Sequence, residues 1–232
     1  MSMKWMAALV AGLWSVTVLA QQGAPQRELP AMEKNKLSYA LGYQIGNDMR
    51  ERELDLDLDT VIRALNDGFA KRDPSIPVED MVGQLAAMEA KLRGDAEAKF
   101  NALAAENKAK SDRFLAENRS KKGVVVLPSG IQYRVIDEGN GARPTPTSEV
   151  EVHYRGSLVS GFEFDSSFAR NQPATFKIDQ VLKGWQEVLP LMRVGDQWQV
   201  FLPPEMAYGD KGPRPIGPNQ ALIFDIKLIS IK

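Results

Sequence analysis

The chain has 232 residues, which is enough for two domains because one hydrophobic core usually serves roughly 100 to 150 residues. Its 29 Lys and Arg against 30 Asp and Glu leave a formal net charge of -1, which gives no electrostatic attraction to nucleic acid or to an anionic membrane surface. The absence of cysteine excludes disulfides, thiol nucleophiles and cysteine-based zinc sites. Partners must therefore be recognised by shape and apolar contact.

The first 20 residues predict a secretory signal peptide. Lys4 precedes an apolar run from Trp5 to Leu19, and the small residue Ala20 completes a cleavage site. The alternative is an uncleaved membrane anchor, but about fifteen apolar residues fall short of the roughly 20 that span a bilayer. Residues 21–31 are polar and predict a flexible lead-in. Export would place the protein in the periplasm, with outer-membrane or surface association as a further alternative.

Two short amphipathic helices are predicted within residues 32–76. Apolar residues recur at helical spacing from Glu33 to Arg52 and again from Leu58 to Phe69. Asp57 or Asp59 could cap the second helix, because aspartate accepts hydrogen bonds from free N–H groups at helix starts.

A long connecting helix is predicted within residues 77–122, running from Pro77 to about Glu117. At 1.5 Å per residue it would be about 60 Å long. Beyond Leu103 its sequence is polar, so we expect that half to lie in solvent and to space one domain from the next. Its first half has a heptad-like apolar seam made of Val78, Met81, Leu85, Met88 and Leu92.

The predicted helical domain is too small to bury its own apolar faces. A homodimer formed through residues 32–92 would cover them, and methionines suit an adaptable interface. The alternative is that these methionines fill a monomeric three-helix core. They are Met32, Met49, Met81 and Met88.

From Gly123 onward the apolar period changes to two, which indicates antiparallel strands with one buried face. In one of them Trp198, Val200 and Leu202 should face the core, with Phe201 on the polar side. One short helix is expected from about Gln180 to Leu189, with Pro190 shortening or kinking its end. The fold class is therefore α+β. The strands are expected around residues 131–136, 150–154, 175–178, 197–202 and 222–228.

The C-terminal half is rich in aromatic side chains and poor in groups that attack bonds. This composition favours a site that binds and reshapes its substrate without a covalent intermediate, a metal or a cofactor. His153 alternates onto the polar face of its strand and is expected in solvent. Asp55, Asp57 and Asp59 lack the glycine and glutamate of an EF-hand loop, so they predict no calcium site.

Five sequence blocks follow one another in the C-terminal half: Val152-His153-Tyr154-Arg155-Gly156, residues 161–167, residues 181–185, Ala207-Tyr208-Gly209 and residues 222–226. In this order they resemble the blocks of FKBP-type peptidyl-prolyl cis-trans isomerases. The run from Leu37 to Gly46 resembles the N-terminal dimerisation domain of the two-domain bacterial subgroup, the macrophage infectivity potentiator (Mip) type. The resemblance implies an isomerase domain at residues 123–232.

The resemblance implies a half-barrel sheet wrapped over the short helix, with the substrate proline ring between them. Proline-containing polypeptides would be its substrates and macrolides of the FKBP class its inhibitors. The catalytic residues would be Asp165, Tyr208 and Tyr154, with the Tyr208 hydroxyl and the Leu182 N–H donating to substrate carbonyls. The substrate-binding residues would be Phe164, Arg170, Phe176, Val181, Leu182, Trp185, Ile216 and Phe224, with Trp185 as the floor and Arg170 orienting Asp165.

Elementary chemistry explains how such a site would work. Rotation about an Xaa–Pro bond costs about 18 to 20 kcal/mol because the amide loses resonance. An apolar cavity disfavours the polar planar amide relative to the less polar twisted one, and so binds the transition state better. Asp165 could contact the rotating carbonyl or only organise the pocket.

Two alternatives stay open from the sequence alone. The cleft could serve a holdase chaperone that grips apolar chain without isomerising it. Taken singly, Trp185 and Phe224 could also be ordinary core residues, and Asp165 a turn acceptor. Two departures from the family pattern bear on the walls: Ala174 stands where many members have an aromatic, and residues 210–215 lack an aromatic or histidine before Ile216.

Overall fold

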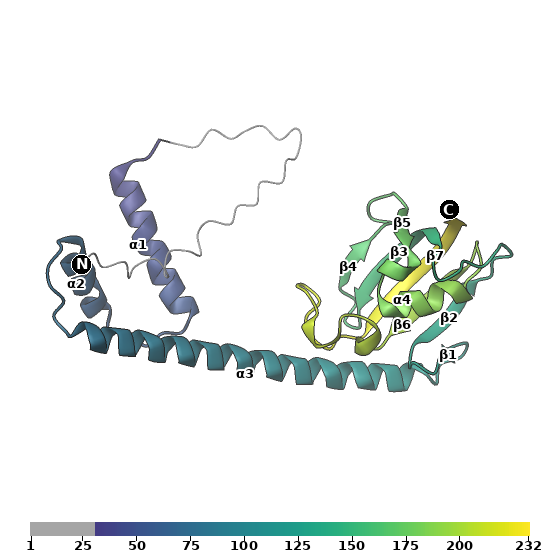
Figure 1. Ribbon diagram of the computed structural model, residues 1–232, viewed down its shortest axis with the longest axis horizontal. Coiled ribbons are helices and arrows are strands. Elements are labelled where there is room, and N and C mark those ends of the chain that lie inside the picture. The colour runs from purple at the N-terminus through teal and green to yellow at the C-terminus, as the bar shows by residue number, and fades with distance from the viewer. Residues whose placement is uncertain (1–30) are drawn as a thin grey trace. The chain divides into compact units, whose positions relative to one another are not determined.

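The computed structural model describes residues 31–232 and divides into two compact units, one ending at Pro74 and the other beginning at Ser75 (Figure 1). The predicted signal peptide, and all of the predicted lead-in except residue 31, lie outside the described residues. Within residues 31–232, no helix is long and apolar enough to cross a membrane.

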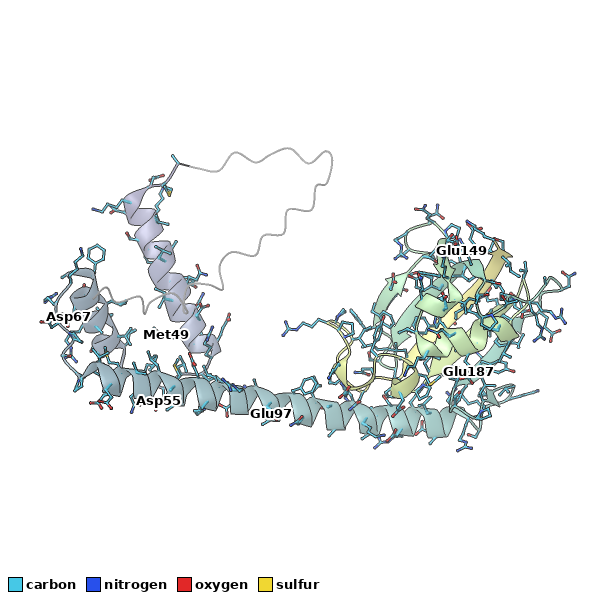
Figure 2. All side chains as sticks on the ribbon, in the orientation of Figure 1. Met49, Asp55, Asp67, Glu97, Glu149 and Glu187 are labelled. Atoms are coloured by element: carbon cyan, nitrogen blue, oxygen red, sulfur yellow. The ribbon has the colours of Figure 1, made fainter. Side chains whose placement is uncertain are left out.

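The first unit contains two helices, α1 (Lys34–Glu51) and α2 (Leu58–Phe69), which confirms both predicted helices. Asp57 is the cap of α2, because its carboxylate accepts a hydrogen bond of 2.6 Å from the Thr60 N–H. Neither helix has a buried residue. Tyr39 is 75% exposed and Phe69 is 94% exposed, and side chains stand out all along both helices (Figure 2).

The second unit begins with α3 (Val78–Asn118), 41 residues long, as the sequence predicts. In the first half of α3 the apolar seam is partly uncovered: Val78 is 51% and Leu85 is 45% exposed, whereas Met81, Met88 and Leu92 are half-buried. Apolar faces of this extent seldom stay open to water in a soluble protein.

The second half of α3 corrects a prediction. One of its faces is buried against the sheet and the connection between β6 and β7, and Asn107, Ser111 and Asn118 on this face are all less than 5% exposed. The Phe114 ring packs on Phe201 with 5.9 Å between centroids. The expectation that this half lies in solvent is therefore wrong for this face, because its polar side chains hydrogen-bond to the C-terminal domain.

The rest of the second unit is built on a seven-stranded antiparallel sheet (Figure 1). The strand order is β1-β2-β6-β7-β3-β4, and β5 pairs with the first half of β3 while β4 pairs with its second half. The five predicted strands are confirmed, whereas β1 and β4 were not predicted as strands. The bounds are β1 Val125–Val126, β2 Gln132–Asp137, β3 Glu149–Leu158, β4 Glu163–Ser166, β5 Ala174–Lys177, β6 Gln197–Leu202 and β7 Leu222–Ile231.

Side chains alternate between the two faces of the sheet, as a period of two requires. Along β3, Val150, Val152 and Tyr154 are buried on the inner face. Phe201 of β6 is the exception: it was predicted on the polar side, yet it is only 5% exposed because Phe114 of α3 covers it. The predicted α+β class is confirmed.

The short helix α4 (Lys183–Val188) lies across the inner face of the sheet (Figure 1). It starts later than predicted: Ile178–Gln180 form a 3-10 turn and Val181 is extended, with φ -97° and ψ -177°. Its end confirms the prediction about Pro190, since the α-helix stops at Val188 and Leu189–Leu191 continue as a 3-10 turn.

Candidate functional site

Four aromatic rings from four strands gather around Trp185 of α4, which is 4% exposed. The edge-to-face contacts place the Tyr154 and Phe224 ring centroids 5.3 Å from Trp185 and the Phe176 centroid 5.9 Å from it. Phe164 in turn meets Phe224 at 5.9 Å. Such arrangements suit the charge distribution of aromatic rings. The fold thus brings together Tyr154, Phe164, Phe176, Trp185 and Phe224.

Glycines make room for this aromatic cluster. A Cβ added to Gly156 would lie 2.7 Å from the Phe164 ring and 2.8 Å from the Phe224 ring. A Cβ on Gly184 would lie 2.4 Å from Leu202, so this glycine lets α4 approach the sheet. Both glycines belong to the five sequence blocks, but their position in the sequence alone does not predict this packing role.

A polar group borders the aromatic cluster. Asp165 accepts a hydrogen bond from the Tyr154 hydroxyl and another from Arg170, which also donates to the Tyr154 hydroxyl at 3.2 Å. Burial raises the pKa of Asp165, but the hydrogen bonds from Tyr154 and Arg170 outweigh it and hold that pKa below its ordinary value. Asp165 is therefore a carboxylate at neutral pH. Burial, followed by the bond to Asp165, raises the pKa of Tyr154, which stays a neutral donor.

The turn before α4 presents a backbone donor. Among the described residues, none accepts a hydrogen bond from the Leu182 N–H, although the Leu182 carbonyl accepts from Trp185 and Gln186. The Gln186 side chain donates to the Val181 carbonyl at 2.8 Å and so fixes this turn. Gln186 was not predicted from the sequence, because a glutamine on a short helix gives no signal of its own.

Two predicted residues come from the connection between β6 and β7. Ile216 is 7% exposed and packs against the core, and Tyr208 is 40% exposed. Burial, and then the negative charge of Asp165, raises the pKa of Tyr208. Tyr208 therefore keeps its hydroxyl proton at neutral pH and can donate a hydrogen bond. Val181 and Leu182 are partly buried and pack against the same core.

His153 lies outside the aromatic cluster. Its prediction as a solvated side chain is wrong: it is half-buried, its Nδ1 lies 3.0 Å from the Ser167 hydroxyl and its ring stacks on Phe168. Ser167 accepts from the Tyr154 N–H at 2.7 Å, so this pair supports the strand that carries Tyr154.

A broad hollow of about 620 Å³ lies on the other face of the sheet, lined in part by Arg155, Phe168 and Gln199. No ring of the aromatic cluster lines it. Its arginine, Arg155, is already paired with Asp225 at 2.6 Å. The aromatic cluster, where apolar surface and uncommitted donors converge, is the candidate substrate site.

The geometry defines a class of protein. A buried aromatic floor, one uncommitted backbone N–H and the Tyr208 hydroxyl can hold a small apolar ring and its flanking carbonyls, but they cannot attack a bond. These are the requirements of a peptidyl-prolyl isomerase, which rotates an amide without breaking one.

Comparisons with known proteins agree with this class. Residues 141–229 match the family model for "FKBP-type peptidyl-prolyl cis-trans isomerase", and residues 34–135 match the one for "Domain amino terminal to FKBP-type peptidyl-prolyl isomerase". The chain belongs to the FKBP-type peptidyl-prolyl isomerase family and is a peptidyl-prolyl cis-trans isomerase.

Individual relatives extend over most of the chain. "Outer membrane protein MIP" of Legionella longbeachae is 41% identical and covers 100% of this chain and 99% of its own length. "Peptidyl-prolyl cis-trans isomerase Mip" of Coxiella burnetii is 39% identical over 86% of this chain and 87% of its own. The solved structure of FkpA from Escherichia coli matches with a TM-score of 0.71 and 34% identity, covering 88% of this chain and 99% of that chain.

Proposed function

We propose that the isomerase reaction takes place over Trp185, with the substrate proline ring held among Tyr154, Phe176 and Phe224. The Leu182 N–H and the Tyr208 hydroxyl donate to the carbonyls that flank the proline. The observation that carries this proposal is the meeting of the aromatic rings around a buried tryptophan, directly beside an ionised aspartate.

Catalysis in this proposal comes from unequal solvation of two amide geometries. The planar amide is strongly polar, and the aromatic walls solvate it worse than water does. The twisted amide has less charge separation and a more basic nitrogen. It therefore loses less solvation free energy than the planar amide when it moves from water into the site. Donors at the edge hold the flanking carbonyls in both geometries while the ring side turns. The unequal solvation of the two amide geometries is what binds the transition state better than the ground state.

The direct test is turnover of a short Xaa-Pro peptide that starts enriched in the cis form. The full chain is expected to accelerate cis-to-trans exchange far beyond the uncatalysed rate of tens to hundreds of seconds. Folded protein that leaves the rate unchanged would contradict the proposal. The alternative of a holdase without isomerase activity is not favoured, because the chain matches the isomerase family model over residues 141–229.

We further propose that the chain acts as a homodimer through residues 32–92. Support comes from the uncovered apolar side chains of α1, α2 and the first half of α3, among them Tyr39, Ile62 and Leu85. A Cβ at Gly42 or Gly46 would meet nothing within 4 Å, so the α1 backbone is open to close approach by another helix.

Substituting Ile62 by glutamate tests the dimer. Ile62 is 49% exposed on α2, and a charge at the centre of an apolar interface is costly to bury. The parent should have a dimer mass by light scattering at micromolar concentration, and Ile62→Glu should shift it toward the monomer. Ile136→Glu is the matched control, because Ile136 is 44% exposed on β2 outside the proposed interface. A monomeric parent would refute the dimer.

We also propose that the protein assists folding of clients outside the cytoplasm. Support comes from the charged start and apolar run of residues 4–19, and from a relative named as an outer membrane protein. Sequencing of the exported mature protein should find Gln21 at its N-terminus. Protein that keeps Met1 and stays in the cytoplasm would contradict this location.

A further inference from the structure

The second half of α3 presents polar side chains to the loop beside the aromatic site. Asn107 and Ser111 are four residues apart, so they lie on one face of the helix. Asn107 is 4% exposed and Ser111 is fully buried. Buried polar groups are costly unless they are hydrogen-bonded, so their partners are informative.

All their partners lie in the connection between β6 and β7, which Figure 1 shows next to this half of α3. The Asn107 amide donates to the Pro218 carbonyl at 2.8 Å. The Ser111 hydroxyl donates to the Asn219 carbonyl at 2.9 Å and accepts from the Ala221 N–H at 2.7 Å. In return, the Asn219 amide donates to the Ala104 carbonyl of α3 at 3.2 Å.

These hydrogen bonds fix the end of the β6–β7 connection, which carries Tyr208 and Ile216 at one edge of the site. The Asn219 N–H donates to the Gly209 carbonyl at 2.8 Å, which ties the gripped end directly to the residue after Tyr208. Asn219 has a φ of 53°, which is the left-handed backbone region. This residue is also the one that both donates to and accepts from α3. Ile216 stands between the two tied ends.

We propose that Asn107, Ser111 and Asn219 are positioning residues of the isomerase, through which the long helix holds Tyr208 and Ile216 at the rim. This inference rests on the proposed roles of Tyr208 and Ile216 in substrate binding. In this proposal α3 supports the substrate site as well as connecting the domains. Through Tyr208 and Ile216 it helps the site to recognise the substrate residues that flank the proline.

The same helix offers a matched control. Asn118 is equally buried, at 2% exposed, and donates to the Gln132 side chain at 3.0 Å. Gln132 belongs to β2 and makes a return bond to the Leu115 carbonyl at 2.8 Å. Losing the Asn118 bond should weaken the packing of α3 on the sheet but leave the hydrogen bonds between α3 and the β6–β7 connection intact.

The experiment compares Ser111→Ala, Asn107→Ala and Asn118→Ala in the full chain, using an Xaa-Pro tetrapeptide and measuring KM, kcat and Tm. Rim contacts are made in the ground state and the transition state alike, so their loss should raise KM more than it lowers kcat. Ser111→Ala is expected to raise KM about 3- to 10-fold, which is the fold-change that corresponds to the free energy of one or two hydrogen bonds. The value of kcat should change by less than about 2-fold. Asn118→Ala should lower Tm comparably and leave KM unchanged.

Asn219→Gly keeps the proposal testable if Ser111→Ala does not fold. Glycine tolerates the positive φ and keeps the backbone bonds of residue 219, so only the side-chain bond to Ala104 is lost. It should raise KM in the same direction by about 2-fold. An equal KM effect from Asn118→Ala, or parental KM in both Ser111→Ala and Asn107→Ala, overturns the inference.

The outcomes separate this inference from the proposed function. Trp185→Ala is assayed alongside. If it behaves like the parent, the aromatic site itself is misassigned; if it loses activity while the Ser111 and Asn107 variants keep parental KM, only the positioning role of α3 fails.

Discussion

Replacing Trp185 with alanine is expected to lower kcat/KM about 10- to 100-fold, because a buried apolar side chain contributes roughly 1.5 to 3 kcal/mol and each 1.36 kcal/mol is a factor of ten in rate. Trp185 touches three other aromatic rings at 5.3 to 5.9 Å. Alanine would open the floor to water, which would solvate the planar amide again and remove the advantage of the twisted one.

The difficulty of this variant is that it also costs stability, since large-to-small changes in a core remove roughly 3 to 5 kcal/mol. Trp198→Ala is the matched control. Trp198 is 6% exposed against 4% for Trp185, and the indole N–H of each lacks a hydrogen-bond partner among the described residues. Trp198 stacks on Tyr133, outside the aromatic cluster.

The two tryptophan variants should therefore lose similar Tm but differ in activity. Trp198→Ala should keep kcat/KM within about 3-fold of the parent when assayed well below its Tm. Equal losses of activity in both variants would mean that the effect of Trp185 is only structural. Parental activity in a folded Trp185→Ala protein would remove the aromatic floor from the mechanism.

Much of the site was predictable because its residues lie in short blocks whose internal spacing sets their faces. Tyr154 and Gly156 are two apart on β3 and so share the inner face, and Trp185 follows a turn fixed within the same block. The fold then needs only to bring a few blocks together. The roles of these residues in catalysis are still proposals, whereas their positions around one cluster are observed.

What could not be predicted depends on partners far away in the sequence. Asn107 and Ser111 belong to a polar helical stretch that has no local sign of burial, and their partners are more than 100 residues distant. Phe201 follows the strand period but is buried because Phe114 covers the other face. In each case a tertiary contact overrides the local pattern, and such contacts cannot be read from a single sequence.

The start of α4 differs from its predicted position for a local reason. Val181 and Leu182 continue the apolar helical spacing, yet Val181 is extended and Leu182 only caps the helix. The Gln186 side chain bonds to the Val181 carbonyl and stabilises the turn instead of another helical turn. This difference matters functionally, because an earlier helix start would place the Leu182 N–H within the helix and reorient it relative to the site.

Removing the charge of Asp165 should reduce activity about 10-fold. Charge-assisted hydrogen bonds contribute roughly 1.5 to 3 kcal/mol, and this carboxylate accepts from both Tyr154 and Arg170. In Asp165→Asn the amide oxygen can still accept from one of them, but the ion pair is lost. The measurement is kcat/KM with the tetrapeptide, and a parental value would exclude Asp165 from both catalysis and pocket organisation.

The pH dependence of Asp165 has a definite sign. Its pKa in the fold lies below the ordinary value of 3.8, so its stabilising contribution is present above that value and is lost as the pH falls through the lower folded pKa. The activity of the parent should thus not change through titration of this group between pH 5 and 8. The Tm difference between the parent and Asp165→Asn should shrink only in strongly acidic solution.

A double-mutant cycle with Tyr154→Phe distinguishes a direct role of Asp165 from an organising one. If Asp165 only orients Tyr154, removing the Tyr154 hydroxyl should leave Asp165→Asn with little further effect, so the double variant should match the worse single variant. If the carboxylate acts on the rotating carbonyl itself, the two losses should multiply. Because Tyr154 also forms a wall of the aromatic cluster, phenylalanine is the right substitution: it keeps the ring against Trp185 and removes only the donor.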